Sequence, residues 1–486
     1  MTISTDRAGR VHFGRRRAIL FSTACSAILV CTASVHGSTG AYISPIFPIL
    51  NSTSPTSMPM TTRVTTGFWT ATPNAMTATD GWTLRGVAPG RDGALTLAPA
   101  VSPLDCHDVA VDDGVAMYDA HARFCAGHDP YPAGAYHGRD YYNGGPFHAG
   151  TLLSLVRHVA PFDHATVSWA ADTPVGTWLQ THLRVLLAPS SWSRWYSLPV
   201  WASDATTVRR HSVDGQDGDG VAIETDTLAL HGAATATAYQ LSITLFSGTP
   251  SGPDSRVSPA LRRLSIALSH NSRIAADAST GTGATLMEGA AAGWAGELAV
   301  PARSQMLAAY QGLGYGGDGE AWCSPTSTSM LLAYWAHRLG RPDLGVSVPA
   351  AARGVYDWTY DGGGNWPFNV AYAASFAGMD GYVARFPSLA ALRPWLAAGV
   401  PLALSVSFGP GELPGAPLLS TPGHLLVLRG FTPAGDPIVN DPAAPDDDAV
   451  RLIYPHAAFE HAWLAGSGGT TYVIFPRAWK VPVASG

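Results

Sequence analysis

Charged residues are scarce in this sequence, and lysine is nearly absent. Charged residues make up 13% of the 486 residues, hydrophobic residues make up 46%, and Lys480 is the single lysine. The formal net charge is −6. A chain this apolar and this weakly charged is typical of a globular protein and not of a disordered one. Beyond residue 17 no basic stripe occurs, which argues against nucleic-acid binding.

Cysteine is also scarce, with five in the chain. Cys25 and Cys31 fall in an apolar N-terminal stretch. Cys106 and Cys125 are the natural disulfide pair if the chain is exported, and two free buried thiols are the alternative. Cys323 then stands alone. An unpaired thiol in an oxidising compartment needs a reason, and catalysis is one.

The N-terminal segment has the layout of an export signal. Residues 15–17 are three arginines, and they lead into an apolar stretch that reaches about Val35. Consecutive arginines are typical of a twin-arginine signal; a general-secretion signal and an uncleaved anchor are the alternatives. We expect residues 1–37 to be the signal and residues 38–65 to be a linker rich in Ser, Thr and Pro. The protein would then be secreted or held at the cell surface, with no stable membrane span after signal removal.

The length exceeds what one hydrophobic core normally organises, so we expect more than one domain. Within residues 66–275, short runs of alternating apolar and polar residues follow one another. The clearest runs are residues 165–169, 181–187, 239–246 and 262–268. Many such strands without helical periodicity predict an all-β sandwich of jelly-roll type.

Aromatic residues cluster near the middle of this all-β region, at Trp192, Trp195, Tyr196 and Trp201. They would either bind a glycan or another cell-surface group, or fill the core of the sandwich. We expect core packing, because buried aromatic side chains commonly dominate cores.

The texture of the sequence changes after an Ala- and Gly-rich linker at residues 276–298. Helices are predicted after Cys323 and at about residues 366–377 and 389–398. Strands are predicted at residues 401–406, 424–428 and 437–439. Helices followed by strands in one block predict an α+β domain over residues 299–478.

Cys323 is predicted to lie at or just before the start of a helix. It follows a Gly-rich loop, and the helix-compatible Pro325 and an apolar periodic segment from Met330 to Leu339 come after it. Unpaired N–H groups and the helix dipole favour an anion at such a position, which lowers the pKa of a thiol. Because the thiolate is the nucleophile, this is a suitable position for a catalytic cysteine. A small buried hydrophobic residue is the alternative.

Two further residues complete a candidate site. His424 opens a predicted strand directly after Gly423, and Asp441 ends the next strand in the sequence Asn440-Asp441-Pro442. If the two strand ends meet, the aspartate can orient the imidazole toward a thiol. A structural histidine and a turn aspartate are the alternatives.

The order of these residues resembles the bacteriocin-processing, double-glycine-leader cysteine peptidases and their transporter-free exported relatives. That family carries Gln, then Cys at a helix start, then Gly-His on a strand, then an Asn-Asp-Pro turn. The matching residues are Gln305, Cys323, His424 and Asp441, and the resemblance covers about residues 299–475. This chain departs from the family in one respect, because Ser324 stands where the family commonly has glycine.

The resemblance implies a papain-like fold, a peptide or protein substrate, and no metal or organic cofactor. It implies that Cys323 and His424 form a thiolate–imidazolium pair and that Asp441 orients His424. The oxyanion hole would combine the side chain of Gln305 with the backbone N–H of Cys323, and Gln311 is a rival for Gln305.

Two other functions are compatible with the same sequence. A cell-wall amidase or acyl transferase would use the same fold on a different bond. A non-catalytic protein would bind a glycan or cell surface through the sandwich and carry an inert peptidase-like domain.

Overall fold

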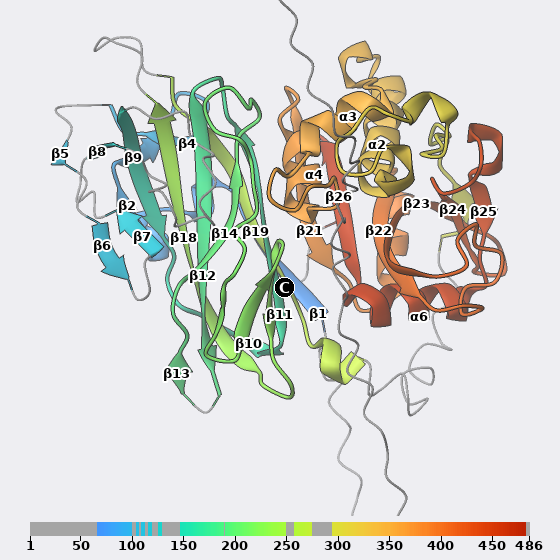
Figure 1. Ribbon diagram of the computed structural model, residues 1–486, viewed down its shortest axis with the longest axis horizontal. Helices are drawn as coiled ribbons and strands as arrows, with labels where there is room; N and C mark the ends of the chain where they lie inside the picture. Colours follow the sequence, from blue (N-terminus) through green and yellow to red (C-terminus); the bar gives the residue numbers. More distant parts are fainter. Residues whose placement is uncertain are drawn as a thin grey trace, which may run out of the picture. The chain divides into compact units, whose positions relative to one another are not determined.

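The computed structural model describes residues 66–99, 146–188, 190–248, 257–274 and 294–482, together with four short strands between residues 104 and 128. Residues Thr62–Gly486 form one compact unit. It consists of an N-terminal all-β region followed by a C-terminal α+β region (Figure 1). The predicted signal and first linker lie outside the described residues, and so does Cys106, while Cys125 belongs to a described strand, β8.

The first sheet of the β region has eight strands in the order β15-β16-β17-β11-β19-β4-β3, with β1 paired to β19. All of its pairings are antiparallel. Its strands are β1 (Thr66–Ala71), β3 (Val87–Pro89), β4 (Leu95–Leu97), β11 (His164–Asp172), β15 (Asp217–Gly218), β16 (Val221–Glu224), β17 (Thr227–Leu230) and β19 (Ala260–Ser269).

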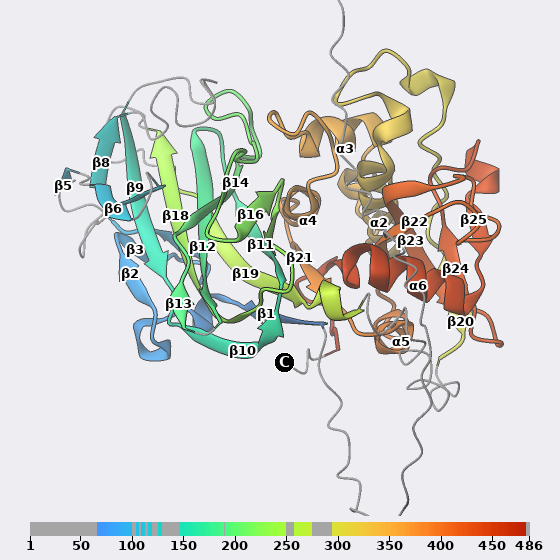
Figure 2. The same ribbon diagram turned by 60° about the horizontal axis from the view of Figure 1, so that its bottom comes forward.

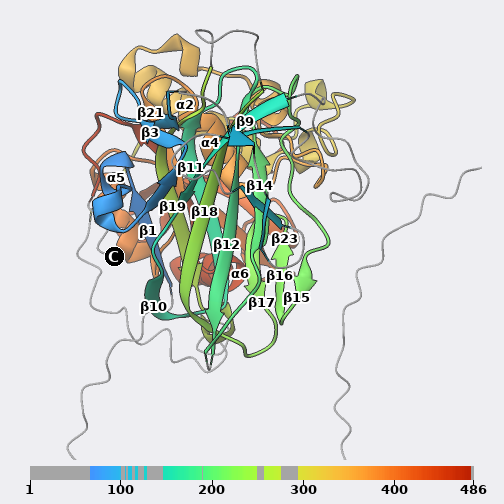
Figure 3. The same cartoon turned by 90° about the vertical axis from the view of Figure 1, so that its left-hand side faces the viewer.

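The second sheet has nine strands in the order β13-β12-β18-β9-β8-β5, with β10, β14 and β2 joined at its sides. Figure 3 shows its two longest strands, β12 and β18, side by side. Its strands are β2 (Thr83–Arg85), β5 (Leu104–Asp105), β8 (Cys125–His128), β9 (Pro146–Leu153), β10 (Arg157–Phe162), β12 (Thr177–Leu187), β13 (Ser191–Trp192), β14 (Tyr196–Trp201) and β18 (Ala236–Gly248). A separate hairpin pairs β6 (Asp108–Val111) with β7 (Val115–Tyr118).

The two sheets share one hydrophobic core. Trp169 and Leu264 from the first sheet pack with Leu179 and Leu241 from the second. The four strand runs expected from alternation fall inside β11, β12, β18 and β19. The alternation therefore identified the strands that build this core.

The aromatic cluster divides between the core and the surface. Trp195, Tyr196 and Trp201 are buried, as core packing requires. Trp192 is 36% exposed at β13, with the guanidinium of Arg184 over its ring, so its assignment to the core was wrong. Strand β13 has two residues and lies at the edge of its sheet, so few neighbouring residues are available to bury the indole.

The α+β region contains a seven-stranded antiparallel sheet in the order β21-β26-β22-β23-β24-β25, with β20 paired to β23. Its strands are β20 (Gly296–Glu297), β21 (Met379–Arg385), β22 (Leu402–Phe408), β23 (Thr421–Phe431), β24 (Pro437–Asn440), β25 (Arg451–Ile453) and β26 (Thr470–Pro476). Its helices are α2 (Cys323–Leu339), α3 (Val348–Val355), α4 (Trp366–Ala374), α5 (Arg393–Ala397) and α6 (His456–Ser467). Helix α6 packs against β22 (Figure 2).

The order of elements differs from the expectation of helices first and strands second. Strand β21 lies between α4 and α5, and α6 with β26 closes the chain. Both strands form the side of the sheet next to the β region, where they are buried along their whole length. A strand buried on both faces loses the alternation by which it can be recognised.

Polar contacts fasten the β region to the α+β region. The guanidinium of Arg263 on β19 donates a bidentate pair of hydrogen bonds to Asp380 on β21, the shorter at 2.7 Å. The hydroxyl of Ser168 on β11 accepts a 2.9 Å hydrogen bond from the N–H of Val383. These contacts explain why the second face of β11, which alternation would leave in water, is buried.

Candidate active site

Cys323 is the first residue of α2. The helix runs on through the buried apolar residues Met330 to Ala336 and ends at Leu339, where Gly340 caps it in a left-handed conformation with φ of 64°. The helix start is therefore where the sequence predicted it. At that position the thiol lies beside backbone N–H groups with no partner inside the helix.

His424 and Asp441 are brought together by the pairing of β23 with β24. Val427 on β23 pairs with Asn440 on β24, so Asp441, the next residue, lies level with Leu426, two residues along β23 from His424. The imidazole Nε2 and the Oδ1 of Asp441 are 2.7 Å apart, and both side chains are buried. Nε2 is thereby committed to the carboxylate, which leaves Nδ1 for the thiol.

Strand β23 begins three residues earlier than expected. Thr421 already pairs with Phe408 of β22, and the register shifts between this pair and that of Val406 with His424. Such a bulge re-aims a side chain, and bulges are common next to active sites.

Tyr454 is a further partner of Asp441 that the sequence did not indicate. Its hydroxyl donates a 2.8 Å hydrogen bond to Oδ2, while Oδ1 also accepts one of 2.9 Å from the N–H of Ala443. The carboxylate is thus held on both oxygens. No motif marks Tyr454, because it reaches Asp441 only through the fold.

The Asn440-Asp441-Pro442 turn also positions Gln305. The side-chain amide of Asn440 donates to the carbonyls of Val300 and Pro301 at 3.3 and 3.2 Å. The carbonyl of Pro442 accepts a 2.8 Å hydrogen bond from the backbone N–H of Gln305. One turn therefore fixes both the partner of His424 and the segment that carries Gln305.

The side chain of Gln305 is 3% exposed and lines the same cleft as Cys323. Its Nε2 donates a 2.6 Å hydrogen bond to the carbonyl of Glu320. A side-chain amide has two N–H groups, so the second one can donate to another acceptor. Gln311, the rival for this role, is exposed and is not among the residues that line the cleft.

The electrostatics favour an ion pair between Cys323 and His424. Burial disfavours the thiolate, but the hydrogen bond and positive charge of His424, with the backbone N–H groups of Leu425 and Ser324, lower the pKa of Cys323. Burial also disfavours the imidazolium, but the charge and hydrogen bond of Asp441 raise the pKa of His424. Burial disfavours the carboxylate too, and His424 still lowers the pKa of Asp441. The proton is therefore best held on the imidazole.

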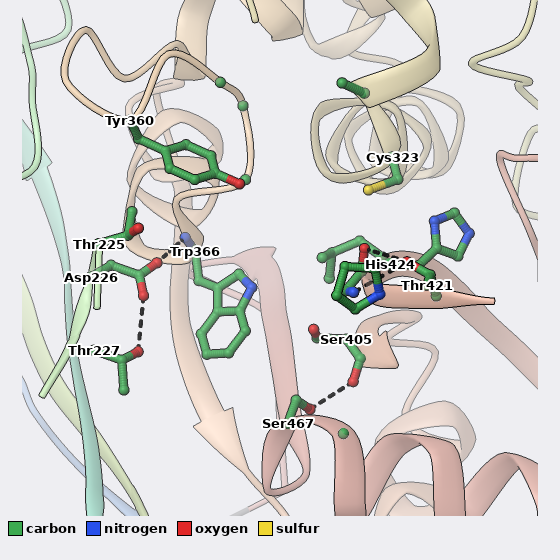
Figure 4. A pocket seen from close by; sticks show the side chains of 18 of the residues that line it. Thr225, Asp226, Thr227, Cys323, Tyr360, Trp366, Ser405, Thr421, His424 and Ser467 are labelled. Carbon is green, nitrogen blue, oxygen red and sulfur yellow. Dashed lines mark hydrogen bonds between the residues drawn. The ribbon is translucent and has the colours of Figure 1, made fainter. Parts of the chain in front are cut away.

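A cleft of about 660 Å³ opens over these residues. Cys323 and His424 lie on one side of it, and Tyr360 and Trp366 lie on the other (Figure 4). Gly316, in the Gly-rich loop before Cys323, also lines it. This glycine has φ of +81°, and a Cβ there would come within 2.3 Å of the carbonyl oxygen of Asp361. A glycine is therefore required for two cleft loops to pack this closely.

The two tryptophans near the site have different roles. Trp366 lines the cleft. Trp322 is fully buried among Val348 and Ala352, and its indole N–H donates to the carbonyl of Tyr315. Trp322 is thus a core residue that supports the loop before Cys323.

Ser324 turns away from the cleft. Its buried hydroxyl is 2.8 Å from the hydroxyl of Tyr472 on β26, and it is not among the cleft-lining residues. A serine in place of glycine here does not narrow the approach to Cys323.

Two further properties concern metals and membranes. Among the described residues, no group of three or more His, Cys, Asp or Glu side chains is arranged to hold a metal ion. None of the helices in the described part of the chain is long and apolar enough to cross a bilayer.

Comparison with known families matches both regions of the chain. Residues 76–269 match the peptidase C39 N-terminal domain, and residues 297–470 match the Peptidase_C39-like family. The chain belongs to the peptidase C39-like family and carries the C39 N-terminal domain. No curated protein matches it.

Solved structures give weaker similarities. A structure described as a C39-like peptidase from Bacillus anthracis has 16% identity and a TM-score of 0.26, covering 36% of this chain and 94% of that one. The Gx strain structure of infectious bursal disease virus has 10% identity and a TM-score of 0.16, covering 42% of this chain and 53% of that one. TM-scores this low do not support a fold assignment.

Proposed function

We propose that this protein is an exported cysteine peptidase. It would hydrolyse peptide bonds with a C-terminal papain-like domain that follows an N-terminal β-sandwich of jelly-roll type. Cys323 is the nucleophile, His424 is the general acid and base, and Asp441 orients and charges His424. The observation that carries the proposal is the chain of contacts from the partly buried Cys323 through the buried His424 to the buried Asp441 on one side of the cleft. Membership of a peptidase family supports peptide as the substrate class.

The reaction begins with attack of the Cys323 thiolate on a peptide carbonyl carbon. The carbonyl oxygen becomes an oxyanion, which accepts hydrogen bonds from the backbone N–H of Cys323 and the free side-chain N–H of Gln305. The imidazolium of His424 gives its proton to the leaving amine as the carbon–nitrogen bond breaks, and a thioester remains. Neutral His424 then removes a proton from water, and hydroxide attack on the thioester regenerates the thiolate and releases the acid.

Peptide turnover tests the proposed function directly. The mature chain is incubated under mild reductant with a diverse peptide library, and new peptide termini are identified by mass spectrometry. We expect cleavage by the wild-type chain and none by Cys323→Ala, while both have the same thermal stability. Cleavage that is equal in the two chains, or absent from both, would contradict the proposal and favour a binding protein.

Export is proposed from the basic and apolar segment at residues 1–37. Expression in a bacterial host followed by N-terminal sequencing of the extracellular fraction tests it. We expect a mature chain that begins near residue 37. A full-length chain that stays with the cells would refute cleavage of the signal.

A further inference from the structure

A turn of the N-terminal β region lines the same cleft as Cys323. The turn joins β16 to β17 and comprises residues 224–227, all of which line the cleft. Thr225, Asp226 and Thr227 lie across the cleft from Cys323 (Figure 4). The cleft therefore has one side built by the peptidase domain alone and another side to which the β region contributes.

This turn is fastened to the peptidase domain by a buried carboxylate. Asp226 Oδ2 accepts a 2.5 Å hydrogen bond from the backbone N–H of Trp366, the first residue of α4. Its Oδ1 accepts one of 2.9 Å from the hydroxyl of Thr227. Asp226 thus accepts from the first N–H of α4, next to the N-cap residue Asn365. The first side chain of this helix, Trp366, lines the cleft. The turn and the indole are held as one surface.

A second contact from the β region holds the loop beside this surface. Buried Asp357 accepts hydrogen bonds from the backbone N–H and the hydroxyl of Ser212 in the β region, at 3.0 and 3.3 Å. The same carboxylate accepts one of 3.1 Å from the N–H of Tyr360, whose side chain lines the cleft. The β region therefore positions two stretches of the cleft wall that the peptidase domain supplies.

The turn keeps an unfavourable residue at the cleft surface. Glu224 pairs with Thr227, so Thr225 and Asp226 form a two-residue turn, and Thr225 has φ of 58°. Such turns favour glycine at a position of positive φ, and a β-branched residue there is an outlier. Strained residues of this kind persist mainly at functional sites.

We propose that the residue 224–227 turn is a substrate-binding wall of the peptidase cleft and that Thr225 is a specificity-determining residue. Peptide binds as an extended segment between this wall and the Cys323 side. Thr225 contacts the bound peptide, and Asp226 is a positioning residue that holds Trp366. The proposal rests on the proposed function, because a specificity wall has meaning only if Cys323 attacks peptide.

The test compares peptide cleavage profiles of the full mature chain and two variants of the wall. Thr225→Gly removes the side chain and suits positive φ, so it should fold at least as well as the wild type. Thr225→Asn keeps a polar side chain of different shape and tolerates the same backbone. We expect each variant to change the ratio of kcat/KM between peptides of the library by about tenfold, the effect of one small group in a binding pocket.

Asp219→Gly is the matched control. Asp219 also has positive φ, at 54°, in the neighbouring β15–β16 turn, but it is exposed and does not line the cleft. We expect its cleavage profile to equal that of the wild type. If the peptide cleavage profiles of Thr225→Gly and Thr225→Asn equal that of the wild type, the proposal that the residue 224–227 turn sets specificity is wrong.

Alkylation of Cys323 by iodoacetamide distinguishes failure of the proposed peptidase function from failure of the specificity wall alone. This small reagent does not need the wall, so the Thr225 variants should keep the wild-type rate while their peptide profiles change. Wild-type Cys323 that reacts like an ordinary thiol would overturn the proposed function and the wall with it. Normal alkylation with unchanged profiles would overturn the wall alone.

The positioning role of Asp226 has its own readout. Asp226→Ala removes the acceptor for the first N–H of α4, whereas Asp226→Asn keeps an acceptor for the N–H of Trp366 and a donor for Thr227. We expect a higher KM for Asp226→Ala with a nearly unchanged alkylation rate, and recovery of the wild-type KM in Asp226→Asn. Equal KM values in all three chains would refute this role.

Discussion

Two buried aspartates hold the two sides of the cleft, and their surroundings shift their pKa values in opposite directions. Asp441 faces the imidazole of His424, and the positive charge of that ring lowers its pKa despite burial. Asp226 is also buried but accepts hydrogen bonds from neutral groups, and burial raises its pKa to about 7. The comparison shows that burial alone does not decide whether a carboxylate is charged, because a partner charge can outweigh desolvation. The two aspartates also differ in role: Asp441 acts on the Cys323–His424 pair, whereas Asp226 holds the wall formed by the residue 224–227 turn.

The largest expected effect comes from removing Asp441. Asp441→Ala leaves His424 with no orienting partner and a lower pKa, so kcat/KM should fall by about 10⁴-fold, as in catalytic triads that lose their aspartate. Asp226→Ala is the comparison variant and should leave the alkylation rate of Cys323 nearly unchanged. Steady-state kinetics on one cleaved peptide checks the loss of kcat/KM, and the rate of iodoacetamide alkylation is measured in both variants. Equal losses of alkylation rate in the two variants would break the distinction between the aspartates.

Gln305 should have the next largest effect. Gln305→Ala removes one oxyanion donor, so kcat should fall by about 10²–10³-fold, as in the protease precedent for this interaction. KM should change little, because the donor acts mainly on the oxyanion. Gln311→Ala removes an exposed glutamine outside the cleft and should match the wild type. The opposite result would move the oxyanion role to Gln311.

Asp441→Asn isolates the charge from the hydrogen bond. The amide oxygen can still accept from His424, and Cys-His-Asn sites occur in papain-like peptidases, so kcat/KM should fall only about tenfold. Without the carboxylate charge, the pKa of His424 falls and the upper pH limit of activity moves to lower pH. A pH profile of kcat/KM measures the shift. An unchanged upper limit would show that Asp441 does not charge the imidazole.

Tyr454→Phe should have a smaller effect of the same kind. It removes one donor to Asp441 and leaves the aromatic packing in place. Because a hydrogen bond to a charged group contributes about 1.5–3 kcal/mol and Asp441 keeps its other partners, kcat should fall about tenfold or less. KM should stay at the wild-type value. A loss confined to thermal stability would make Tyr454 a purely structural residue.

The smallest effect on catalysis is expected for Asp226→Asn, whose main effect is on stability. The pKa of Asp226 in the folded protein, about 7, lies above the ordinary aspartate pKa of 3.8. Between these values the unfolded chain releases a proton that the folded chain keeps, so wild-type stability is lost as pH rises. The asparagine side chain in the Asp226→Asn variant does not titrate, so the variant does not lose this stability as pH rises. The Tm of the variant should equal that of the wild type near pH 4 and exceed it by a few degrees near pH 7. A Tm difference that does not change with pH would contradict the raised pKa.

Much of this architecture could be predicted from local sequence. Alternation identified β11, β12, β18 and β19, and the apolar segment after Cys323 identified α2. The Gly-His and Asn-Asp-Pro motifs indicated which strand ends would carry His424 and Asp441. These features depend on residues close together in the chain, where periodicity and turn chemistry operate.

The remaining features depend on contacts between distant segments. Asp226 and Trp366 are 140 residues apart, and nothing near either residue indicates the other. Tyr454 reaches Asp441 because β25 pairs with β24. Strand β25 has three residues, which is too short for its sequence pattern to predict this pairing. The Cys106–Cys125 disulfide and the export signal stay predictions, because both involve residues outside the described part of the chain.

The most direct test of the account is the pH dependence of Cys323 alkylation in the wild type and in His424→Ala. A thiolate–imidazolium pair predicts rapid alkylation that persists far below the pKa of a free thiol, about 8.5. In His424→Ala the reaction should slow and follow an ordinary thiol titration. Alkylation that follows the ordinary titration in both chains would contradict the activated pair and, with it, the proposed peptidase activity.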